Sequence, residues 1–358
     1  MKSFRAPGRV NLIGDHTDYN EGFVLPLAIG LDCLVRATPR SDGLVHVTSL
    51  DLGEDVHVAA DGSSEPAEVE PAWGRHAAGV VRSLAERGRE PAGIDAVVSS
   101  TVPIGAGLSS SAAFEVALAL ALCDAGGLRL EPVELAQACQ EAERIATGVP
   151  VGIMDQLASL TGRRGHALLI DCRSLDVEPI PLPPRLTVVI VHSGVSRTLA
   201  GSAYAERRRT CEMVAARLGI PALRDATPDQ VADEPRARHV VSENARVLEA
   251  ARALSDGEIE ALGPLLEASH ASLRDDYEVS TPELDALAEE LVAAGALGAR
   301  LTGAGFGGCV VGLASRDTAD AVVEKAAGRY WARTGRQPRA FVCRPADGAG
   351  VERERTNA

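Results

Sequence analysis

The feature that most constrains the fold is a glycine- and serine-rich turn that leads into an almost wholly apolar helix. Residues 102–113 read Val-Pro-Ile-Gly-Ala-Gly-Leu-Ser-Ser-Ser-Ala-Ala and follow a predicted strand at residues 94–100. We predict a helix from residue 109 to about 124, with Gly126 and Gly127 as its stop signal. Because this helix has almost no polar face, we expect it to be buried inside the domain.

The turn before this helix is suited to binding phosphate. Its glycines let a ligand approach the backbone, and its serines are expected to cap the helix while its free amides stay exposed. The helix dipole and these amides form an anion site that needs no lysine. A simple capped helix after a tight turn is the alternative. A hydrolase nucleophile elbow does not fit, because residues 107–111 lack the closing glycine of G-x-S-x-G.

Lysine is nearly absent, which limits how the chain could handle phosphate. The only two lysines are Lys2 and Lys325, and neither follows a glycine loop or lies on an early kinase-type strand. Any phosphoryl transfer must therefore rely on backbone amides, arginine and a metal ion.

A second glycine loop, residues 303–308, matches the dinucleotide pattern G-x-G-x-x-G by its letters alone. That pattern requires a helix to follow, whereas residues 309–313 read as a strand. We therefore reject a dinucleotide-dependent oxidoreductase and predict a hairpin turn that approaches the phosphate site from a second domain. A purely structural turn is the alternative.

A polar cluster near the start of the chain gathers arginine, histidine, asparagine and two carboxylates within residues 9–20. Carboxylates beside histidine can bind a metal or accept hydrogen bonds from sugar hydroxyls. Ligands one helical turn apart would favour a metal, but nothing here reads as helical. A solvated loop is the alternative.

The order of predicted elements divides the chain into two domains with a cleft between them. Residues 1–60 are rich in strand patterns, and helices are predicted at residues 73–87 and 132–147. Strands at 168–170 and 186–192 flank a proline-rich segment, where we place the boundary between domains 1–182 and 183–358. The second domain is predicted to be mainly helical, with helices at 203–218, 237–254, 258–272, 282–295 and from 318, and strands at 309–313 and 340–342.

Composition excludes several classes of protein and partner. The net charge of −14 disfavours a nucleic-acid partner, and no apolar stretch is long enough to span a membrane. Seven scattered cysteines without a CxxC pair indicate buried thiols in a reducing compartment. The first residues lack an apolar leader, so we expect a cytoplasmic protein. No long exposed apolar face stands out, so we expect a monomer.

Several ordered segments together resemble the GHMP small-molecule kinase family, and within it the galactokinase branch. Residues 8–19, Gly-Arg-Val-Asn-Leu-Ile-Gly-Asp-His-Thr-Asp-Tyr, are similar to the signature of that branch. Residues 103–113 resemble the phosphate loop of the family and residues 301–309 its third motif. Similarity continues through residues 152–156, 204–211, 243–247 and 272–284, and so covers nearly the whole chain.

The resemblance implies an α+β fold with a ribosomal S5 domain 2-like N-terminal domain and a ferredoxin-like C-terminal domain. It also implies ATP- and Mg²⁺-dependent phosphorylation of the C1 hydroxyl of galactose. The residues it implies at the site are the catalytic Asp155 and Arg9; the sugar-binding Asp15, His16, Asp18, Gly152 and Tyr204; the phosphate-loop Pro103, Gly105, Ala106, Gly107, Leu108, Ser109, Ser110 and Ser111; and the Mg²⁺ ligands Ser111 and Glu143.

The resemblance also implies how the catalytic pair divides its work. Asp155 would accept or orient the C1 hydroxyl proton, while Arg9 would hold Asp155 ionised and stabilise charge on the transferring phosphoryl group. A carboxylate beside arginine is a weak base, so we favour alignment with late proton acceptance. Full general-base catalysis stays open.

One residue departs from the usual pattern of the branch, which most often has Glu at the position of Asp15. The shorter side chain reaches about 1.5 Å less far toward the hydroxymethyl end of the sugar. We therefore expect looser discrimination at C6 than at C4. A kinase of galactosamine, galacturonate or arabinose, and a non-catalytic sensor of galactose and ATP, are the remaining alternatives.

Overall fold

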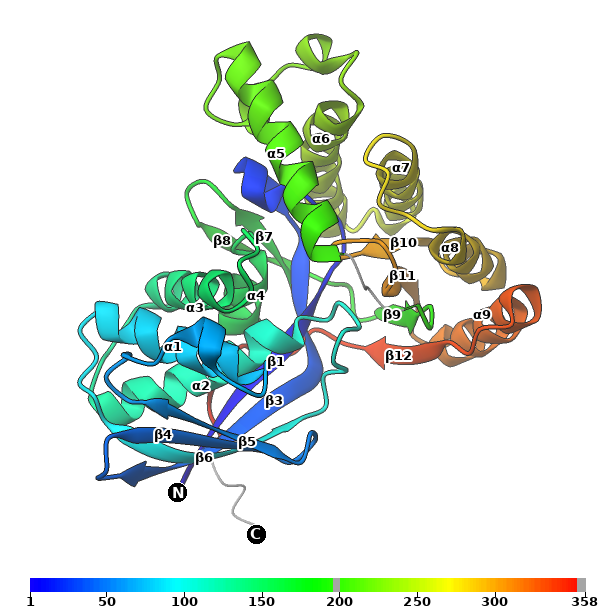
Figure 1. Ribbon diagram of the computed structural model, residues 1–358. Coiled ribbons are helices and arrows are strands. Elements are labelled where there is room, and N and C mark those ends of the chain that lie inside the picture. The colour runs from blue at the N-terminus through cyan, green and yellow to red at the C-terminus, as the bar shows by residue number, and fades with distance from the viewer. Residues whose placement is uncertain (196–199, 353–358) are drawn as a thin grey trace.

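The computed structural model describes residues 1–195 and 200–352, which form two sets of sheets and helices (Figure 1). No helix in this described part of the chain combines the length and apolarity needed to cross a bilayer. All seven cysteines are free and buried, as predicted.

A six-stranded sheet forms the base of the first half, in the order β13-β1-β3-β6-β4-β5. Apolar residues alternate along β4 and β5, so that Val45, Val47, Val56 and Val58 are buried and the residues between them are not. Its strands are β1 (Lys2–Asn11), β3 (Pro26–Arg40), β4 (Leu44–Ser49), β5 (Glu54–Ala59), β6 (Gly93–Ser100) and β13 (Gly350–Val351).

Helices cover one face of this sheet (Figure 1). They are α1 (Gly74–Glu86), α2 (Ser110–Gly126), α3 (Pro132–Thr147) and α4 (Met154–Thr161). The apolar helix predicted from residue 109 is α2, which lies against β1 and β3 and is contacted by the other three helices. It ends at Gly127, whose φ of 68° suits a glycine cap. The prediction of a buried central helix is confirmed.

A small sheet of order β2-β7-β8 stands beside the larger one. Its strands are β2 (Phe23–Val24), β7 (His166–Asp171) and β8 (Val177–Pro181). Sequence reasoning treated the prolines of this region only as a linker, and the strand β8 was missed. Because β8 is an edge strand, Pro179 and Pro181 remove no hydrogen bond that a second neighbour would need.

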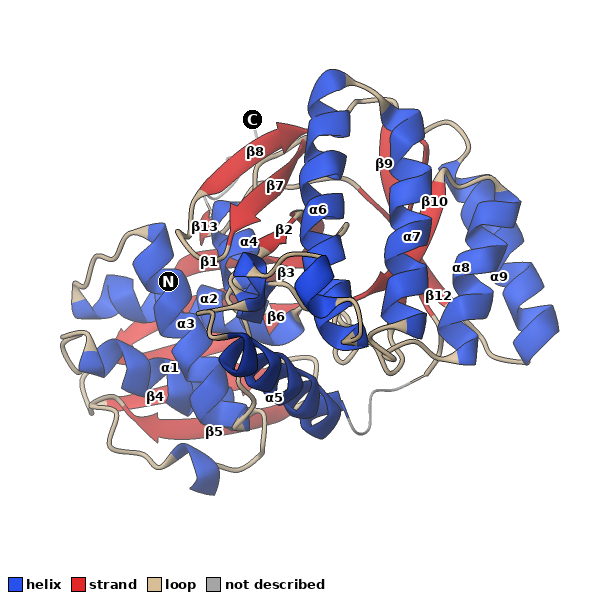
Figure 2. Ribbon diagram, turned by 90° about the horizontal axis from the view of Figure 1, so that it is seen from above, coloured by secondary structure: helices blue, strands red, loops and turns tan. Residues whose placement is uncertain are grey.

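The second half contains an antiparallel sheet of order β10-β11-β9-β12. Figure 2 shows α6, α7, α8 and α9 in a row along it. Its strands are β9 (Leu186–His192), β10 (Gly298–Thr302), β11 (Cys309–Ser315) and β12 (Arg339–Cys343), and its helices are α5 (Ala200–Leu218), α6 (Pro235–Asp256), α7 (Leu262–Asp275), α8 (Pro282–Ala294) and α9 (Ala319–Thr334). Short 3₁₀ turns lie at Asp18–Asn20, Pro66–Glu68, Leu223–Asp225, Asp229–Val231 and Ile259–Ala261.

The two halves of the chain contact each other in two ways, through strand pairing and through a common apolar core. After β12 the chain returns to the first half, where β13 pairs with β1 at Phe4 and Arg5. Apolar side chains of β9, α6 and α7 also join the core cluster that contains the first sheet. The division of the chain at residue 182 stays a proposal, and residues 345–351 lie against the first half.

The close approach of β1 to the glycine loop predicts a mutational effect. A methyl group at Gly8 would lie 2.7 Å from the carbonyl oxygen of Leu108, whereas one at Gly30 would meet nothing within 4 Å. We expect Gly8→Ala to lower the free energy of unfolding by about 1–3 kcal/mol because the loop must shift. Urea unfolding measures this change. Gly30→Ala is the control, and equal stability of the two variants would contradict the packing described.

Candidate active site

An open cleft of about 550 Å³ lies where the two halves meet, and residues from both line it. Most of the residues implied by the resemblance are there. Those that line it are Arg9, Asp15, His16, Asp18, Gly105, Gly107, Ser109, Ser110, Ser111, Glu143, Gly152, Asp155 and Tyr204. Ala106 and Leu108 are instead buried under the loop, and Pro103 lies outside the lining.

The glycine loop presents the start of α2 to the cleft, but its serines do not act as predicted. Ser109 has a left-handed φ of 59° and makes no side-chain cap on the helix. Its hydroxyl instead donates to Asp155, and the Ser111 hydroxyl donates to Glu143 at 2.8 Å. The prediction of a serine cap is therefore wrong, because carboxylates compete for these hydroxyls. The side chain of Ser109 makes no hydrogen bond to the first amides of α2, and the anion site expected there stays a prediction.

Arg9 and Asp155, which both line the cleft, form a bidentate ion pair. Arg9 Nε donates to Asp155 Oδ1 at 2.7 Å, and Arg9 Nη2 donates to Oδ2 at 2.6 Å. The third nitrogen, Nη1, donates to the carbonyl of Gly107 at 2.8 Å. Arg9 lies on β1 and Asp155 in the first turn of α4. One guanidinium thus fixes the carboxylate and the glycine loop at once.

Glu143 offers a half-buried carboxylate beside this pair. Gln156 Nε2 donates to its Oε2 at 2.7 Å, and Ser111 holds the other oxygen. Burial, with a smaller contribution from the charge of Asp155, raises the pKa of Glu143 to about 7. A carboxylate and a hydroxyl at the end of an anion site are oxygen ligands of the kind Mg²⁺ shares with phosphate.

On the other side of the pair, Asp18 lies over the backbone of Gly152. A methyl group on Gly152 would lie 1.7 Å from Asp18 Oδ2, so no larger residue fits while this carboxylate keeps its position. Burial and the neighbouring Asp155 raise the pKa of Asp18 to about 7. Any ligand that donates hydrogen bonds to this carboxylate therefore stabilises its charged form.

Aromatic rings form the wall next to Asp18. His16 has a left-handed φ of 67°, and its Nδ1 is 2.8 Å from the hydroxyl of Tyr19. The ring of Tyr204, from α5, lies 5.6 Å from that of His16 and 5.1 Å from that of Tyr19, between ring centres. Burial lowers the pKa of His16 well below its usual range, so the ring is neutral.

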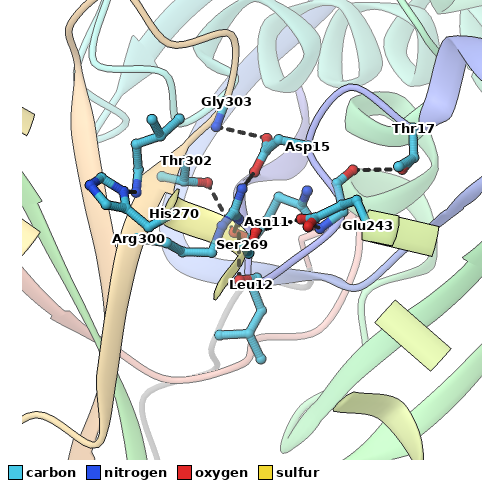
Figure 3. Close-up of polar contacts among 12 residues, drawn as sticks. Asn11, Leu12, Asp15, Thr17, Glu243, Ser269, His270, Arg300, Thr302 and Gly303 are labelled. Atoms are coloured by element: carbon cyan, nitrogen blue, oxygen red, sulfur yellow. Dashed lines mark hydrogen bonds and ion pairs between the residues drawn. The ribbon is translucent and has the colours of Figure 1, made fainter. Parts of the chain in front are cut away.

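Asp15 forms an ion pair with Arg300, a residue that the sequence did not indicate as part of the site. Arg300, on β10, is fully buried and its Nη2 donates to Asp15 Oδ2 (Figure 3). Gly303 N donates to Asp15 Oδ1 at 2.8 Å. An arginine within an apolar strand was the one sequence signal that could have indicated this role, since such a charge is rarely buried without a partner.

Glu243, on α6, is a second residue whose role was not predicted. Its Oε1 accepts hydrogen bonds from the backbone N of Gly14 at 3.0 Å and from Ser269 Oγ at 2.6 Å (Figure 3). Asn244 Oδ1 accepts from the backbone N of Phe23 at 2.8 Å. These two side chains of the second half therefore hold the backbone within the polar cluster, at Gly14, and just after it, at Phe23.

The second glycine loop is a hairpin turn, as predicted, since β10 and β11 pair in an antiparallel register from Gly298–Leu313 to Thr302–Cys309. Gly303 and Ala304 line the cleft. The Cys309 thiol contacts the carbonyl of Ala106 at 3.0 Å, so the same hairpin also reaches the first glycine loop.

Family models match three parts of the chain. The model for the GHMP kinases N terminal domain matches residues 75–163, and the model for the GHMP kinases C terminal domain matches residues 248–332. A third model, the galactokinase galactose-binding signature, matches residues 2–39, which include the polar cluster.

Individual relatives agree with these models. A galactokinase of Roseiflexus sp. (strain RS-1) is 47% identical over 97% of this chain and 92% of its own. The crystal structure of Lactococcus lactis galactokinase complexed with galactose has a TM-score of 0.91 and 34% identity, covering 98% of this chain and 94% of its own. Methanococcus jannaschii mevalonate kinase, with 18% identity and a TM-score of 0.72 over 96% of this chain and 98% of its own, shares the fold. The chain belongs to the galactokinases, a branch of the GHMP kinase family.

Proposed function

We propose that this enzyme transfers the γ-phosphoryl group of ATP to the C1 hydroxyl of galactose. The observation that carries the proposal is the Arg9–Asp155 pair, which lies between the phosphate loop and the side chains expected to bind the sugar. A pair in this place contacts both reacting groups. Family membership supports the use of ATP and of a sugar acceptor.

In this proposal Asp155 aligns the attacking hydroxyl and receives its proton. A bond forms between the C1 oxygen and the γ-phosphorus as the bond to ADP breaks, and the proton passes to the carboxylate. The Ser109 hydroxyl and two nitrogens of Arg9 hold the carboxylate in place. Because these contacts fix the orientation of the carboxylate, its main role in this proposal is to align the hydroxyl, and it takes the proton late in the reaction.

The phosphates would lie along Gly105, Gly107 and the first amides of α2. Arg9 is the only arginine or lysine among the described residues that line the cleft. One positive side chain is too little to balance the charge of a triphosphate. Ser111 and Glu143 offer oxygen ligands for a divalent cation that would supply further positive charge. Bound Mg²⁺ would neutralise charge on the phosphates and favour the ionised form of Glu143.

The sugar would lie against His16, Asp18, Gly152 and Tyr204. Asp18 accepts hydroxyl hydrogen bonds best when ionised, and Gly152 lets the ring come close to it. Large apolar side chains exposed on the described surface are scattered over several elements, which supports a monomer.

The first prediction tests the reaction and its central carboxylate. With ATP, Mg²⁺ and galactose, we expect ADP release and galactose 1-phosphate, and Asp155→Asn should lower the rate about 10²–10⁴-fold because it removes the aligning charge. Coupled ADP release and phosphorus NMR of the product measure both.

The exposed Asp317 provides the matched control, and Asp317→Asn should keep the wild-type rate. Galactosamine, galacturonate and arabinose belong in the same panel. Faster turnover on one of these sugars than on galactose would make that sugar the substrate in place of galactose. Galactose binding without any turnover would refute the proposed reaction in favour of a sensor.

The second prediction concerns the C6 end of the sugar. Both oxygens of Asp15 already accept hydrogen bonds from Arg300 and Gly303, which hold this short side chain back against the protein. We therefore expect kcat/KM to fall less for 6-deoxygalactose than for glucose, each compared with galactose. Asp15→Glu, which restores reach, should increase the penalty for 6-deoxygalactose. Equal rejection of the two sugars by the wild type would contradict this role of Asp15.

A further inference from the structure

A second cluster of ligand-type side chains lies far from the cleft, on the outer face of the large sheet. His46 on β4 and His57 on β5 are register partners, and Asp55 comes two residues before His57 on the same face. Helices cover the opposite face, which buries Val45, Val47 and their neighbours (Figure 1). The two imidazole rings are parallel within 2°, with centres 4.2 Å apart.

The ligand atoms of these three side chains converge on one point. Asp55 Oδ2 is 3.1 Å from His57 Nε2 and 3.5 Å from His46 Nε2. All three ligand atoms lie within 4.8 Å of one another. Two ligands of a tetrahedral zinc ion, each about 2.0–2.1 Å from the metal, are about 3.4 Å apart. The spacing already observed therefore needs little adjustment to hold such an ion.

A carboxylate on the next strand prepares His46 for this role. His46 and Asp95 are register partners of the parallel pair β4–β6, and His46 Nδ1 is 2.9 Å from Asp95 Oδ1. Arg40 Nη1 donates to the same oxygen at 2.7 Å and keeps the carboxylate in place. The proton of His46 is thus held on Nδ1, which leaves the lone pair of Nε2 directed to Asp55. Histidine ligands of metals commonly have such a carboxylate behind them.

We propose that His46, Asp55 and His57 bind a divalent transition metal of the zinc class, with water in the remaining position. Two imidazole nitrogens favour Zn²⁺, Co²⁺, Ni²⁺ or Cu²⁺ over Mg²⁺, which prefers oxygen ligands only. When the ion binds, the proton that His57 Nε2 shares with Asp55 moves to Nδ1. The side chains of all three residues are at least one quarter exposed, so the ion can enter from solvent.

The position of the cluster gives the site a structural consequence. Among the described strands, β5 is the edge of its sheet and pairs with β4 alone. A metal bound to His46 from β4 and to two residues of β5 would cross-link the edge strand to its neighbour. Its removal should loosen this hairpin while the cleft on the other side of the domain stays intact.

The experiment is calorimetric titration of the full chain with ZnCl₂, in the presence of Mg²⁺ and galactose, for the wild type and three variants. We expect one zinc ion to bind the wild type and this binding to be lost in His57→Gln. Asp95→Asn should weaken it about 10–100-fold, because only the support of His46 is removed. His166→Gln is the matched control and should bind as the wild type does.

Two further readouts separate this site from others. Zn²⁺ should raise the melting temperature of the wild type but not of His57→Gln, while galactose phosphorylation by His57→Gln without zinc should equal that of the wild type. Equal zinc binding by the wild type and His57→Gln, or no binding by the wild type, would overturn the proposal. Co²⁺ can replace Zn²⁺ in the same titration, because it absorbs light when bound to thiolate. A cobalt–thiolate absorption band that persists in His57→Gln would place the metal on cysteine and would also overturn the proposal.

Discussion

The guanidinium of Arg300 lies fully buried between the two halves of the chain, where it contacts three groups of the first half. It donates to the carboxylate of Asp15 and to the backbone carbonyls of Asn11 and Leu12, at 3.3 and 3.2 Å for the carbonyls. A buried charge without partners would be very costly, so these contacts leave the strand β10 and the end of β1 little freedom to separate. The hydroxyl of Thr302 adds a bond to Asn11 O at 2.9 Å.

This anchor sets the geometry of the side of the cleft that is proposed to bind the sugar. The carbonyls that Arg300 holds lie within the polar cluster, and Glu243 of α6 accepts a hydrogen bond from Gly14 in the same segment. His16 is therefore kept in a left-handed conformation that an isolated loop would rarely adopt. On the side proposed to bind phosphate, Arg9 joins α4 to the glycine loop, and Cys309 of the second half contacts the same loop at Ala106. In the proposed reaction both substrates bind between the two halves, and the contacts of Arg300 fix the halves relative to each other.

The cleft also stores unfavourable electrostatics that its ligands can relieve. Asp18, Glu143 and Asp155 surround a single arginine, and burial raises the pKa of Asp18 and Glu143 to about 7. Ionising these two carboxylates in their buried surroundings therefore costs free energy. In the proposed complex, hydrogen bonds from sugar hydroxyls would favour ionised Asp18, and the charge of Mg²⁺ would favour ionised Glu143. The same carboxylates that destabilise the protein by itself would therefore stabilise the proposed complexes, as is common at active sites.

Local patterns predicted those parts of the structure that depend on local chemistry. The apolar helix α2, the hairpin around Gly303–Gly308 and the burial of the cysteines follow from periodicity, turn residues and composition. The family resemblance placed most of the candidate site residues, whose roles stay proposals. Local patterns failed where distant partners decide: β8 is a strand only because β7 lies beside it, and Ser109 turns to Asp155 rather than to its own helix. Arg300 was missed because its partners lie nearly three hundred residues away in the sequence.

The most direct test of the anchor is a double-mutant cycle between Arg300 and Asp15, read as the free energy of unfolding and as KM for galactose. Arg300→Met alone should cost about 3–5 kcal/mol, because it leaves the Asp15 carboxylate buried without its cation. Asp15→Asn in that background should recover part of the loss, with a coupling energy on the order of 1–3 kcal/mol and a raised KM in every variant. Additive losses of stability, or an Arg300→Met enzyme with an unchanged KM for galactose, would contradict the account.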